Sequence, residues 1–242
     1  MSWLQRFVSM SSRDSRVENE EESHWLSVSD LMAGLMMVFM FVAVVFMRNA
    51  SVEKERIREV AVAYQENQVA LYQALKKEFE GDLGAWEAEI DDATLSFTFQ
   101  SPDVLFTSGY KEIQARFKDI LDDFFPRYLN VLMAFSESIN EVRIEGHTSS
   151  VWGMGTPEEM AYFNNMELSQ GRTRTVLNYV YDLPELAPLR PWVKANVAAV
   201  GFSSSRVILD EEGAEDEEAS RRVSFRVITN ADMQIRRILE ES

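Results

Sequence analysis

One carboxylate, Asp30, lies within a long run of apolar residues, where its chemistry can be argued from position alone. From Val28 to Met47 it is the sole charged residue. At about 1.5 Å per residue, a helix of this length spans about 30 Å, the hydrocarbon thickness of a bilayer. A carboxylate inside that layer costs roughly 2.5–3.5 kcal/mol, and such residues usually lie on ion pathways. Because the run is too long for a signal-peptide core and no small-residue cleavage site follows it, the sequence predicts a retained membrane helix.

Two interpretations of Asp30 remain open from spacing alone. In the first, Ser27 is an N-cap and Asp30 occupies the third helical position, where the helix dipole favours an acid. In the second, Trp25 marks the membrane interface and Asp30 lies about 7 Å below it, inside the apolar layer. Ala33 and Gly34 lie one helical turn from Asp30, and such small residues allow close approach of a partner helix.

Composition excludes several classes of function. The formal net charge of −16 disfavours nucleic-acid binding, because the chain would repel phosphates. The absence of cysteine excludes disulfides, zinc–thiolate sites and a thiol nucleophile. The two histidines, His24 and His147, are far apart, and no metalloprotease motif or glycine-rich phosphate loop occurs. We therefore expect a protein that is not an enzyme and holds no cofactor or metal.

The segment after the apolar run predicts a helical connector over residues 49–92. Apolar residues recur every seven positions at Ile57, Tyr64 and Leu71, and the segment between residues 50 and 80 contains no proline or glycine. Two interpretations fit this stripe. It could form a short parallel coiled coil that pairs two copies of the chain, or a single amphipathic helix that lies on a domain.

From about residue 93 the pattern changes to that of a mixed α and β domain. Leu95, Phe97 and Phe99 alternate with polar residues, as in a half-buried strand. Further strands are expected at 142–145, 197–200 and 223–228, and helices at 110–136, with Pro126 as a candidate break, and at 158–181. This β-α-β-α-β-β order predicts an α+β sandwich with helices on one face of a mixed sheet. The acidic run at residues 210–218 is expected to be a solvated loop, with weak calcium binding as the alternative.

The membrane segment resembles that of the MotB family, the B subunits of flagellar-type stators. The resemblance rests on Trp25 and on the run from Asp30 to Phe39, DLMAGLMMVF. The longer segment from Ser27 to Phe39 is similar to the B subunits of the Zorya anti-phage defence systems. In this family the aspartate at the position of Asp30 carries the translocated proton or sodium ion.

Three motifs in the C-terminal half resemble the OmpA-like peptidoglycan-binding family, to which MotB proteins also belong. They are IEGHT at 144–148, NMELSQGR at 165–172 and RRVSF at 221–225. The resemblance covers about residues 93–230. It implies that Arg172 holds a carboxylate of a cell-wall peptide, since a guanidinium can bind a carboxylate through two hydrogen bonds. The other residues implied in wall binding are Asn165, Leu168, His147, Thr148, Ser149 and Arg221.

The sequence departs from the family at Ser149, where the family has an aspartate that holds the ligand's ammonium group. A serine hydroxyl accepts a hydrogen bond but brings no charge. Either the ligand is held more weakly, or another acid such as Glu167 substitutes, or the site is degenerate. For His147, at a strand end beside a turn, a structural role is expected rather than catalysis or metal binding.

Taken together, the resemblances imply a cytoplasmic tail (1–24), a transmembrane helix (25–48), the connector (49–92), an OmpA-like domain (93–230) and a C-terminal tail (231–242). The implied function is that of the B subunit of an ion-driven rotary stator in anti-phage defence. The implied partners are a second copy of the chain, five copies of a polytopic MotA-like A subunit per two copies of this chain, and peptidoglycan. A flagellar-type stator subunit and a passive membrane-to-wall anchor are the alternatives.

The orientation implied by the family conflicts with the distribution of positive charge. Arg48, Lys54, Arg56 and Arg58 follow the apolar run and outnumber Arg13 and Arg16 before it, which favours a cytoplasmic C-terminus. The OmpA-like resemblance instead implies an inner-membrane protein with a cytoplasmic N-terminus and a periplasmic C-terminal domain, and we adopt this orientation.

Overall fold

The computed structural model describes residues 4–100, 105–107 and 109–230, and within them the side chains except those of residues 4–27, 63 and 64. The predicted C-terminal tail at 231–242 lies outside the described residues. Residues up to Arg58 form one unit, and residues from Glu59 onward form a second. Helix α1 (Leu4–Phe79) supplies the described residues of the first unit and the beginning of the second.

The apolar run lies in the interior of α1. Its residues from Val28 to Met47 are exposed on all sides of the helix. Among the described residues, one helix is long and apolar enough to cross a membrane, judged by length and composition. Since α1 begins at Leu4, Ser27 is not an N-cap, and the capping-box interpretation of Asp30 is wrong.

The C-terminal end of α1 is part of the core of the second unit. Leu71, Leu75 and Phe79 follow one another at intervals of four residues and are 2%, 0% and 0% exposed. In this stretch the structure shows an amphipathic helix packed on a domain, and not a coiled coil. The predicted coiled-coil position Tyr64 lies outside the described side chains, and coiled-coil pairing through Ile57 stays a prediction.

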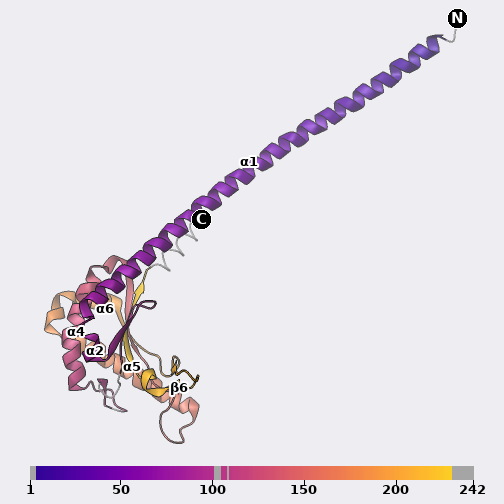
Figure 1. Ribbon diagram of the computed structural model, residues 1–242. Coiled ribbons are helices and arrows are strands. Elements are labelled where there is room, and N and C mark those ends of the chain that lie inside the picture. Colours follow the sequence, from indigo (N-terminus) through magenta and orange to yellow (C-terminus); the bar gives the residue numbers. More distant parts are fainter. Residues whose placement is uncertain (1–3, 101–104, 108, 231–242) are drawn as a thin grey trace. The chain divides into compact units, whose positions relative to one another are not determined.

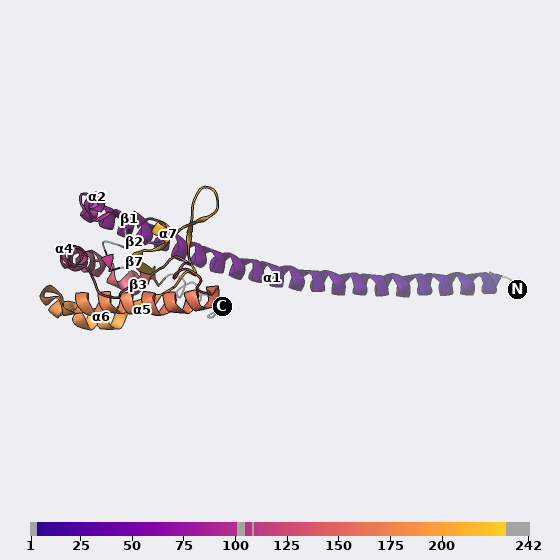
Figure 2. The ribbon, with the colours of Figure 1, turned by 90° about the horizontal axis from the view of Figure 1, so that it is seen from below.

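A five-stranded mixed sheet organises the second unit, with the strand order β1-β2-β7-β3-β4 (Figures 1 and 2). Strands β3 and β4 are parallel, and the other neighbouring pairs are antiparallel. The strands are β1 (Ala88–Asp91), β2 (Ser96–Phe99), β3 (Ile139–Gly146), β4 (Val197–Gly201) and β7 (Val223–Thr229). The predicted strand and helix order is confirmed, and β1 adds a strand inside the range expected to be connector.

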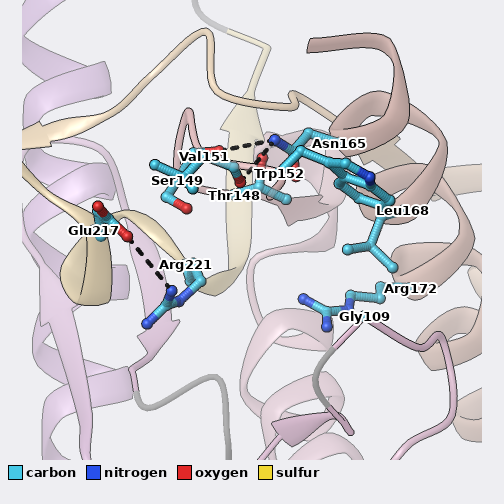
Figure 3. A pocket seen from close by; sticks show the side chains of 10 residues that line it. All are labelled: Gly109, Thr148, Ser149, Val151, Trp152, Asn165, Leu168, Arg172, Glu217 and Arg221. Atoms are coloured by element: carbon cyan, nitrogen blue, oxygen red, sulfur yellow. Dashed lines mark hydrogen bonds and ion pairs between the residues drawn. The ribbon is translucent and has the colours of Figure 1, made fainter. Parts of the chain in front are cut away.

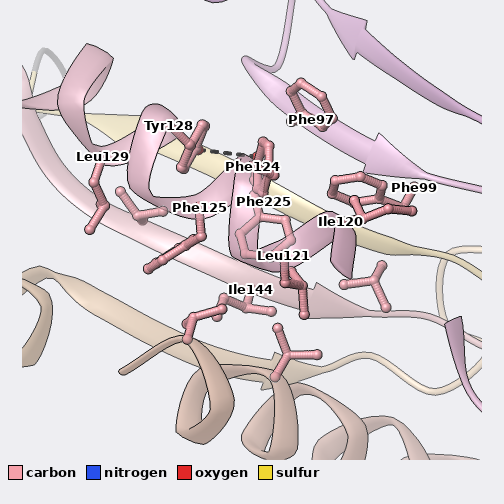
Figure 4. Packing of buried hydrophobic residues seen from close by; sticks show 14 of the residues in the cluster. Phe97, Phe99, Ile120, Leu121, Phe124, Phe125, Tyr128, Leu129, Ile144 and Phe225 are labelled. Atoms are coloured by element: carbon pink, nitrogen blue, oxygen red, sulfur yellow. Dashed lines mark hydrogen bonds between the residues drawn. The ribbon is translucent and has the colours of Figure 1, made fainter. Parts of the chain in front are cut away.

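Two long helices, α4 (Ala115–Met133) and α5 (Glu158–Asp182), share one hydrophobic core with the sheet. Phe124 of α4 lies 4.6 Å from Phe97 and 5.0 Å from Phe225, measured between ring centroids (Figure 4). Phe79 of α1 lies 5.3 Å from Phe97, so α1 and α4 pack on the same face of β2. This arrangement confirms the α+β class with helices on one face of a mixed sheet.

Helix α4 departs from the prediction at its start and at its proline. It begins at Ala115 rather than near residue 110, because Phe106 and Ile113 pair in an isolated β-bridge just before it. It continues through Pro126, which was expected as a candidate break. Burial of the flanking side chains offsets the lost backbone hydrogen bond: Phe124, Phe125, Tyr128 and Leu129 are all 0% exposed.

Short elements connect the long ones. They are α2 (Leu83–Trp86), the 3-10 helices η1 (Ser136–Ser138) and η2 (Pro184–Leu189), α6 (Arg190–Asn196), the hairpin of β5 (Ile208–Leu209) and β6 (Glu215–Asp216), and α7 (Glu217–Ser220). The acidic run at 210–218 forms the turn and second strand of this hairpin and the start of α7. Most of its residues are exposed, as expected for a solvated segment, but it contains regular structure that the prediction of a loop did not include. No group of three or more potential metal ligands occurs among the described residues, so the calcium alternative gains no support.

Candidate functional site

Two glycines bring α5 close to the sheet and so place the NMELSQGR motif. Gly146 and Gly201 are register partners at the ends of the parallel strands β3 and β4. A Cβ atom on Gly201 would lie 2.4 Å from the Gln170 backbone nitrogen, and one on Gly146 would lie 2.9 Å from the Ser169 carbonyl oxygen. Only glycine permits this approach, so α5 crosses the strand ends at residues 169–170.

Next to this crossing, residues from several segments line one cavity of about 360 Å³ (Figure 3). The lining comes from the loop after β3, from α5, from α7 and the residue after it, and from Gly109. It is made of Gly109, Thr148, Ser149, Val151, Trp152, Asn165, Leu168, Arg172, Glu217 and Arg221. The structure thus brings together six of the seven residues expected to bind the wall: all except His147.

Arg172 is 8% exposed and is held from behind by the segment that precedes α4. Its Nε donates to the Tyr110 carbonyl at 3.0 Å, its Nη2 lies 3.4 Å from the Thr107 carbonyl, and its guanidinium carbon lies 4.8 Å from the Phe106 ring centroid. These contacts fix the side chain in one orientation. A fixed guanidinium at the edge of a cavity suits recognition of a carboxylate, because little side-chain entropy is lost on binding.

Asn165 shapes the loop that forms the opposite wall. Its Nδ2 donates to the Ser149 carbonyl at 3.1 Å and to the Val151 carbonyl at 3.4 Å (Figure 3). The Thr148 residue is 4% exposed, and within the described part of the chain its buried hydroxyl has no hydrogen-bond partner. A buried polar atom without a partner is costly, so this hydroxyl is an unmet hydrogen-bonding group beside the cavity.

Arg221 and Glu217 enter the cavity from α7 and its end. The Arg221 Nη1 lies 4.0 Å from a Glu217 carboxylate oxygen, one helical turn away. In the view of Figure 3 this pair and Arg172 lie on opposite sides of the cavity. The position of Glu217 was not expected from the sequence, where it was one of several acids in a run assigned to a solvated loop.

Glu167, proposed from the sequence as the substitute for the family's aspartate, does not line the cavity. Its side chain is 79% exposed and accepts a hydrogen bond from Lys111 Nζ at 2.8 Å. This bond holds the pKa of Glu167 below its usual value. The acid that reaches the cavity is Glu217 instead.

His147 lies behind the cavity wall. It is 5% exposed, its ring stacks on Phe202 at 5.2 Å between centroids, and its Nε2 lies 3.6 Å from Glu145 Oε2. Burial lowers the pKa of His147, and the neighbouring carboxylate only partly offsets this effect. Its backbone N–H donates to the Arg222 carbonyl at 3.0 Å, so the main chain at this residue links the end of β3 to the start of β7. Among the described residues its ring Nδ1 has no hydrogen-bond partner.

Glu145, the partner of His147, is itself 3% exposed. Burial opposes its charged form, but the contact with His147 and the nearby arginines 206 and 226 outweigh this, and the pKa of Glu145 is lowered. A buried carboxylate is tolerated only when cations surround it. This group therefore supports the strand ends rather than the cavity.

The cavity combines two guanidinium groups, one carboxylate, an amide and two hydroxyls. On a chain with a net charge of −16, the local excess of positive charge at Arg172 and Arg221 is a marked exception. A local excess of positive charge favours anionic over cationic ligands. Asp30, the other predicted functional residue, belongs to the first unit and lies exposed on α1.

Comparison with known proteins gives the family. The chain is 57% identical over 224 residues to the Zorya protein ZorB of Escherichia coli, a match that covers 93% of this chain and 95% of that protein. The chain belongs to the ZorB family. No family model matches this member of the ZorB family.

Distant likenesses to solved structures accompany this match. A putative MotB-like protein from Desulfovibrio vulgaris is 22% identical, with a TM-score of 0.47, over 71% of this chain and 94% of that chain. The cell-wall anchor of the type VI secretion system from Pseudomonas aeruginosa is 20% identical, with a TM-score of 0.44, over 64% and 96%. The periplasmic domain of Helicobacter pylori MotB is 16% identical, with a TM-score of 0.43, over 64% and 89%. The assignment to the ZorB family rests on the Escherichia coli relative.

Proposed function

We propose that this chain is the B subunit of an ion-driven rotary stator that acts in anti-phage defence and is anchored to peptidoglycan. Membership of the ZorB family supports the place in a Zorya system. The observation that carries the ion-driven part is the continuity of α1 through Ser27. It removes the role of Asp30 as a helix cap and leaves a carboxylate within an apolar helix, where a functional role is the default expectation.

The mechanism follows from the cost of charge in a membrane. A charged Asp30 at a low-dielectric helix interface is unfavourable, and binding a proton or sodium ion neutralises it. Two copies of this chain inside a ring of five A subunits would present two such carboxylates. Alternation between the charged and neutral states at these two positions would bias rotation of the ring around the wall-anchored pair. Ala33 and Gly34, one turn from Asp30, would allow the A-subunit helices to approach closely.

The second unit supplies the anchor in this proposal. Arg172 binds a carboxylate of a peptidoglycan stem peptide, and Thr148, Ser149, Asn165, Leu168 and Arg221 line the same cavity. The proposal places this unit in the periplasm and the N-terminus in the cytoplasm. It sets aside the positive-charge count after the apolar run, because a wall-binding cavity has its ligand only outside the inner membrane.

The ion-carrying role is tested with Asp30→Asn, which keeps the size of the side chain but cannot release a proton. We expect plating efficiency of phage to rise to that of a strain without the system, while the A subunit still co-purifies in detergent in the normal ratio. Ser29→Ala, one residue away, is the matched control and should retain defence. Full protection by the Asn variant would exclude the ion-carrier role.

The anchoring role is tested separately with Arg172→Ala and purified peptidoglycan sacculi. We expect the full-length chain to sediment with sacculi and the variant to remain largely in the supernatant. Arg174→Ala, on the same helix but outside the cavity, is the control. Equal retention of Arg172→Ala and the unchanged chain would refute the assignment. If the chain binds sacculi but co-purifies with no multi-helix partner, a passive anchor replaces the stator.

A further inference from the structure

A groove of about 320 Å³ lies between α5, α6 and the start of β4. Its apolar lining is Leu177 and Tyr181 of α5, Val193 of α6 and Val197 of β4. Arg190 fixes Tyr181, because its Nε donates to the Tyr181 carbonyl at 2.9 Å and its guanidinium carbon lies 5.6 Å from the ring centroid. The groove shares no lining residue with the cavity of Figure 3, so it is a separate site.

The charges at this groove are all positive. Arg174 and Lys194 line it, both are exposed, and no acid belongs to its lining. Within the part of the chain that the structure describes, neither side chain forms an ion pair. Acidic residues outnumber basic ones 40 to 24 in the whole chain, so a groove with two cations and no acid is unusual here. Charge complementarity acts on the choice of partner, and this groove therefore favours a partner that carries carboxylates.

Next to the groove, the main chain of β4 is open on one side. Strand β4 is an edge of the sheet and pairs with β3 alone. The N–H of Phe202, directly after β4, donates to the Gly146 carbonyl at 2.9 Å. Since alternate residues direct their N–H and C=O groups to opposite sides of a strand, Ala199 and Gly201 direct theirs away from β3. Among the described residues, no main-chain hydrogen bond outside the sheet involves Ala199 or Gly201.

The two edges of the sheet differ in how they are protected. Edge strands of soluble proteins usually carry charges, proline or a bulge, which prevent pairing with another chain. On β1 the exposed residues are Glu89 and Asp91. The sequence of β4 is VAAVG, and these five half-buried residues include no charge and no proline. Strand β4 is therefore the edge that is open to the addition of a further strand.

We propose that β4 and this groove together form a docking site for an extended segment of a partner protein, in which an apolar side chain lies between two carboxylates. The segment adds to the five-stranded sheet through the main chain of Ala199 and Gly201. Because side chains alternate along a strand, every second side chain of the segment faces α5 and α6. The apolar side chain enters the groove, and the carboxylates meet Arg174 and Lys194. The inference does not depend on the proposed ion-carrying and wall-binding roles.

The test measures binding of two rhodamine-labelled heptapeptides to the full-length chain in detergent, by fluorescence anisotropy. In the first, threonine alternates with glutamate, leucine and glutamate; in the second, lysine replaces both glutamates. We expect the acidic peptide to bind about tenfold more tightly, although the net charge of −16 favours the basic peptide elsewhere on the chain. Arg174→Glu combined with Lys194→Glu should invert this preference, which a folding defect cannot do. Lys76→Glu combined with Lys77→Glu makes the same change in net charge on α1, outside the groove, and should keep the original preference.

A proline tests the main-chain part of the site. Ala199→Pro removes an outward N–H but leaves the hydrogen bonds to β3, and proline is tolerated in this position of an edge strand. This variant should lose the acidic peptide while its unfolding transition stays cooperative. Equal affinity of the unchanged chain for the two peptides, or tight binding of the acidic peptide to Ala199→Pro, would overturn the assignment. Absence of binding would also overturn it, and disulfide cross-linking between copies of Ala198→Cys would then identify a second copy as the occupant of β4.

Discussion

A methyl group added at Gly201 is expected to separate α5 from the sheet and to weaken both the fold and the cavity. In Gly201→Ala the new Cβ would lie 2.4 Å from the Gln170 backbone nitrogen and 2.6 Å from the Ser169 hydroxyl oxygen. Ordinary contacts of a Cβ are about 3.4–4 Å, so the helix and β4 must move apart by about 1 Å. The Ser169 hydroxyl also accepts a hydrogen bond from the Ser203 backbone at 3.1 Å, which this movement disturbs.

The magnitude follows from the type of contact. Inserting a methyl group into a packed interior costs about 1–3 kcal/mol. The nearest atom met here, the Gln170 nitrogen, is backbone and cannot rotate away. For a domain of this size, each kcal/mol lowers the unfolding midpoint by about 2–4 °C. We therefore expect the unfolding midpoint of Gly201→Ala to decrease by about 2–12 °C. Sacculus binding should also fall, because Leu168 and Arg172 lie within one turn of the displaced residues.

The assay is thermal unfolding of the full-length chain in detergent, followed by tryptophan fluorescence, together with sedimentation with sacculi. Gly146→Ala should cost less than Gly201→Ala, because its closest contact is the Thr173 methyl group at 2.8 Å. Gly84→Ala is the control, since its Cβ would meet nothing within 4 Å, and its midpoint should not fall. If all three variants have the same unfolding midpoint as the unchanged chain, the close approach of α5 to the sheet does not determine the stability of the fold.

Three further outcomes are expected. Because burial lowers the pKa of His147 below 6.5, the unfolded chain takes up the proton first as the pH falls. The unfolding midpoint should therefore decrease below about pH 6.5, and His147→Gln should flatten this decrease; equal slopes would contradict the argument. The Arg127 guanidinium forms ion pairs with Glu78, Asp82 and Asp123 at 2.8, 3.0 and 3.1 Å. Arg127→Lys keeps the charge but loses the planar group that can bind several carboxylates at once. In urea unfolding, this variant should be less stable by about 1–2 kcal/mol. The chain has no cysteine, so single cysteines can report its orientation in the membrane. In spheroplasts, Glu211→Cys in the β5–β6 turn should react with a membrane-impermeant maleimide, and Ser2→Cys should react only after lysis. The reverse pattern would support the cytoplasmic C-terminus that the positive-charge count favours.

Local patterns in the sequence were sufficient to predict the membrane-length helix and the main strands and helices of the second unit. An apolar run with one charge has few structural outcomes, because unsatisfied backbone groups are not tolerated in a bilayer. The strands at Phe97–Phe99 and Val223–Val227 and the helix from Glu158 follow from side-chain periodicity, which is fixed by backbone geometry. At Ser27 a local helix-start signal, and at Pro126 a local helix-break signal, lies inside a helix that continues through it.

The connector shows why one amphipathic stripe leaves its partner undecided. Leu71, Leu75 and Phe79 would pack equally well against a second copy of the helix or against a domain of the same chain. The structure decides for the domain, because the aromatic rings of Phe97 and Phe124 meet Phe79 there. The apolar stripe of the helix does not itself predict that Phe97 and Phe124 are its packing partners.

Periodicity and motif spacing were enough to predict a lone carboxylate in a membrane-length helix, the α+β class, and Arg172, Asn165 and Leu168 as neighbours on one helical motif. The distance between residues of one helix follows from their spacing in the sequence, so their proximity can be predicted. The carboxylate of the cavity had no such signal. Glu167 is on the motif helix but points to solvent and Lys111, while Glu217 reaches the cavity from α7, about fifty residues later. The choice between these two acids depends on long-range contacts. The hydrogen bonds that Ser150 donates to Glu215 join segments about 65 residues apart, and no local sequence pattern encodes such a pairing.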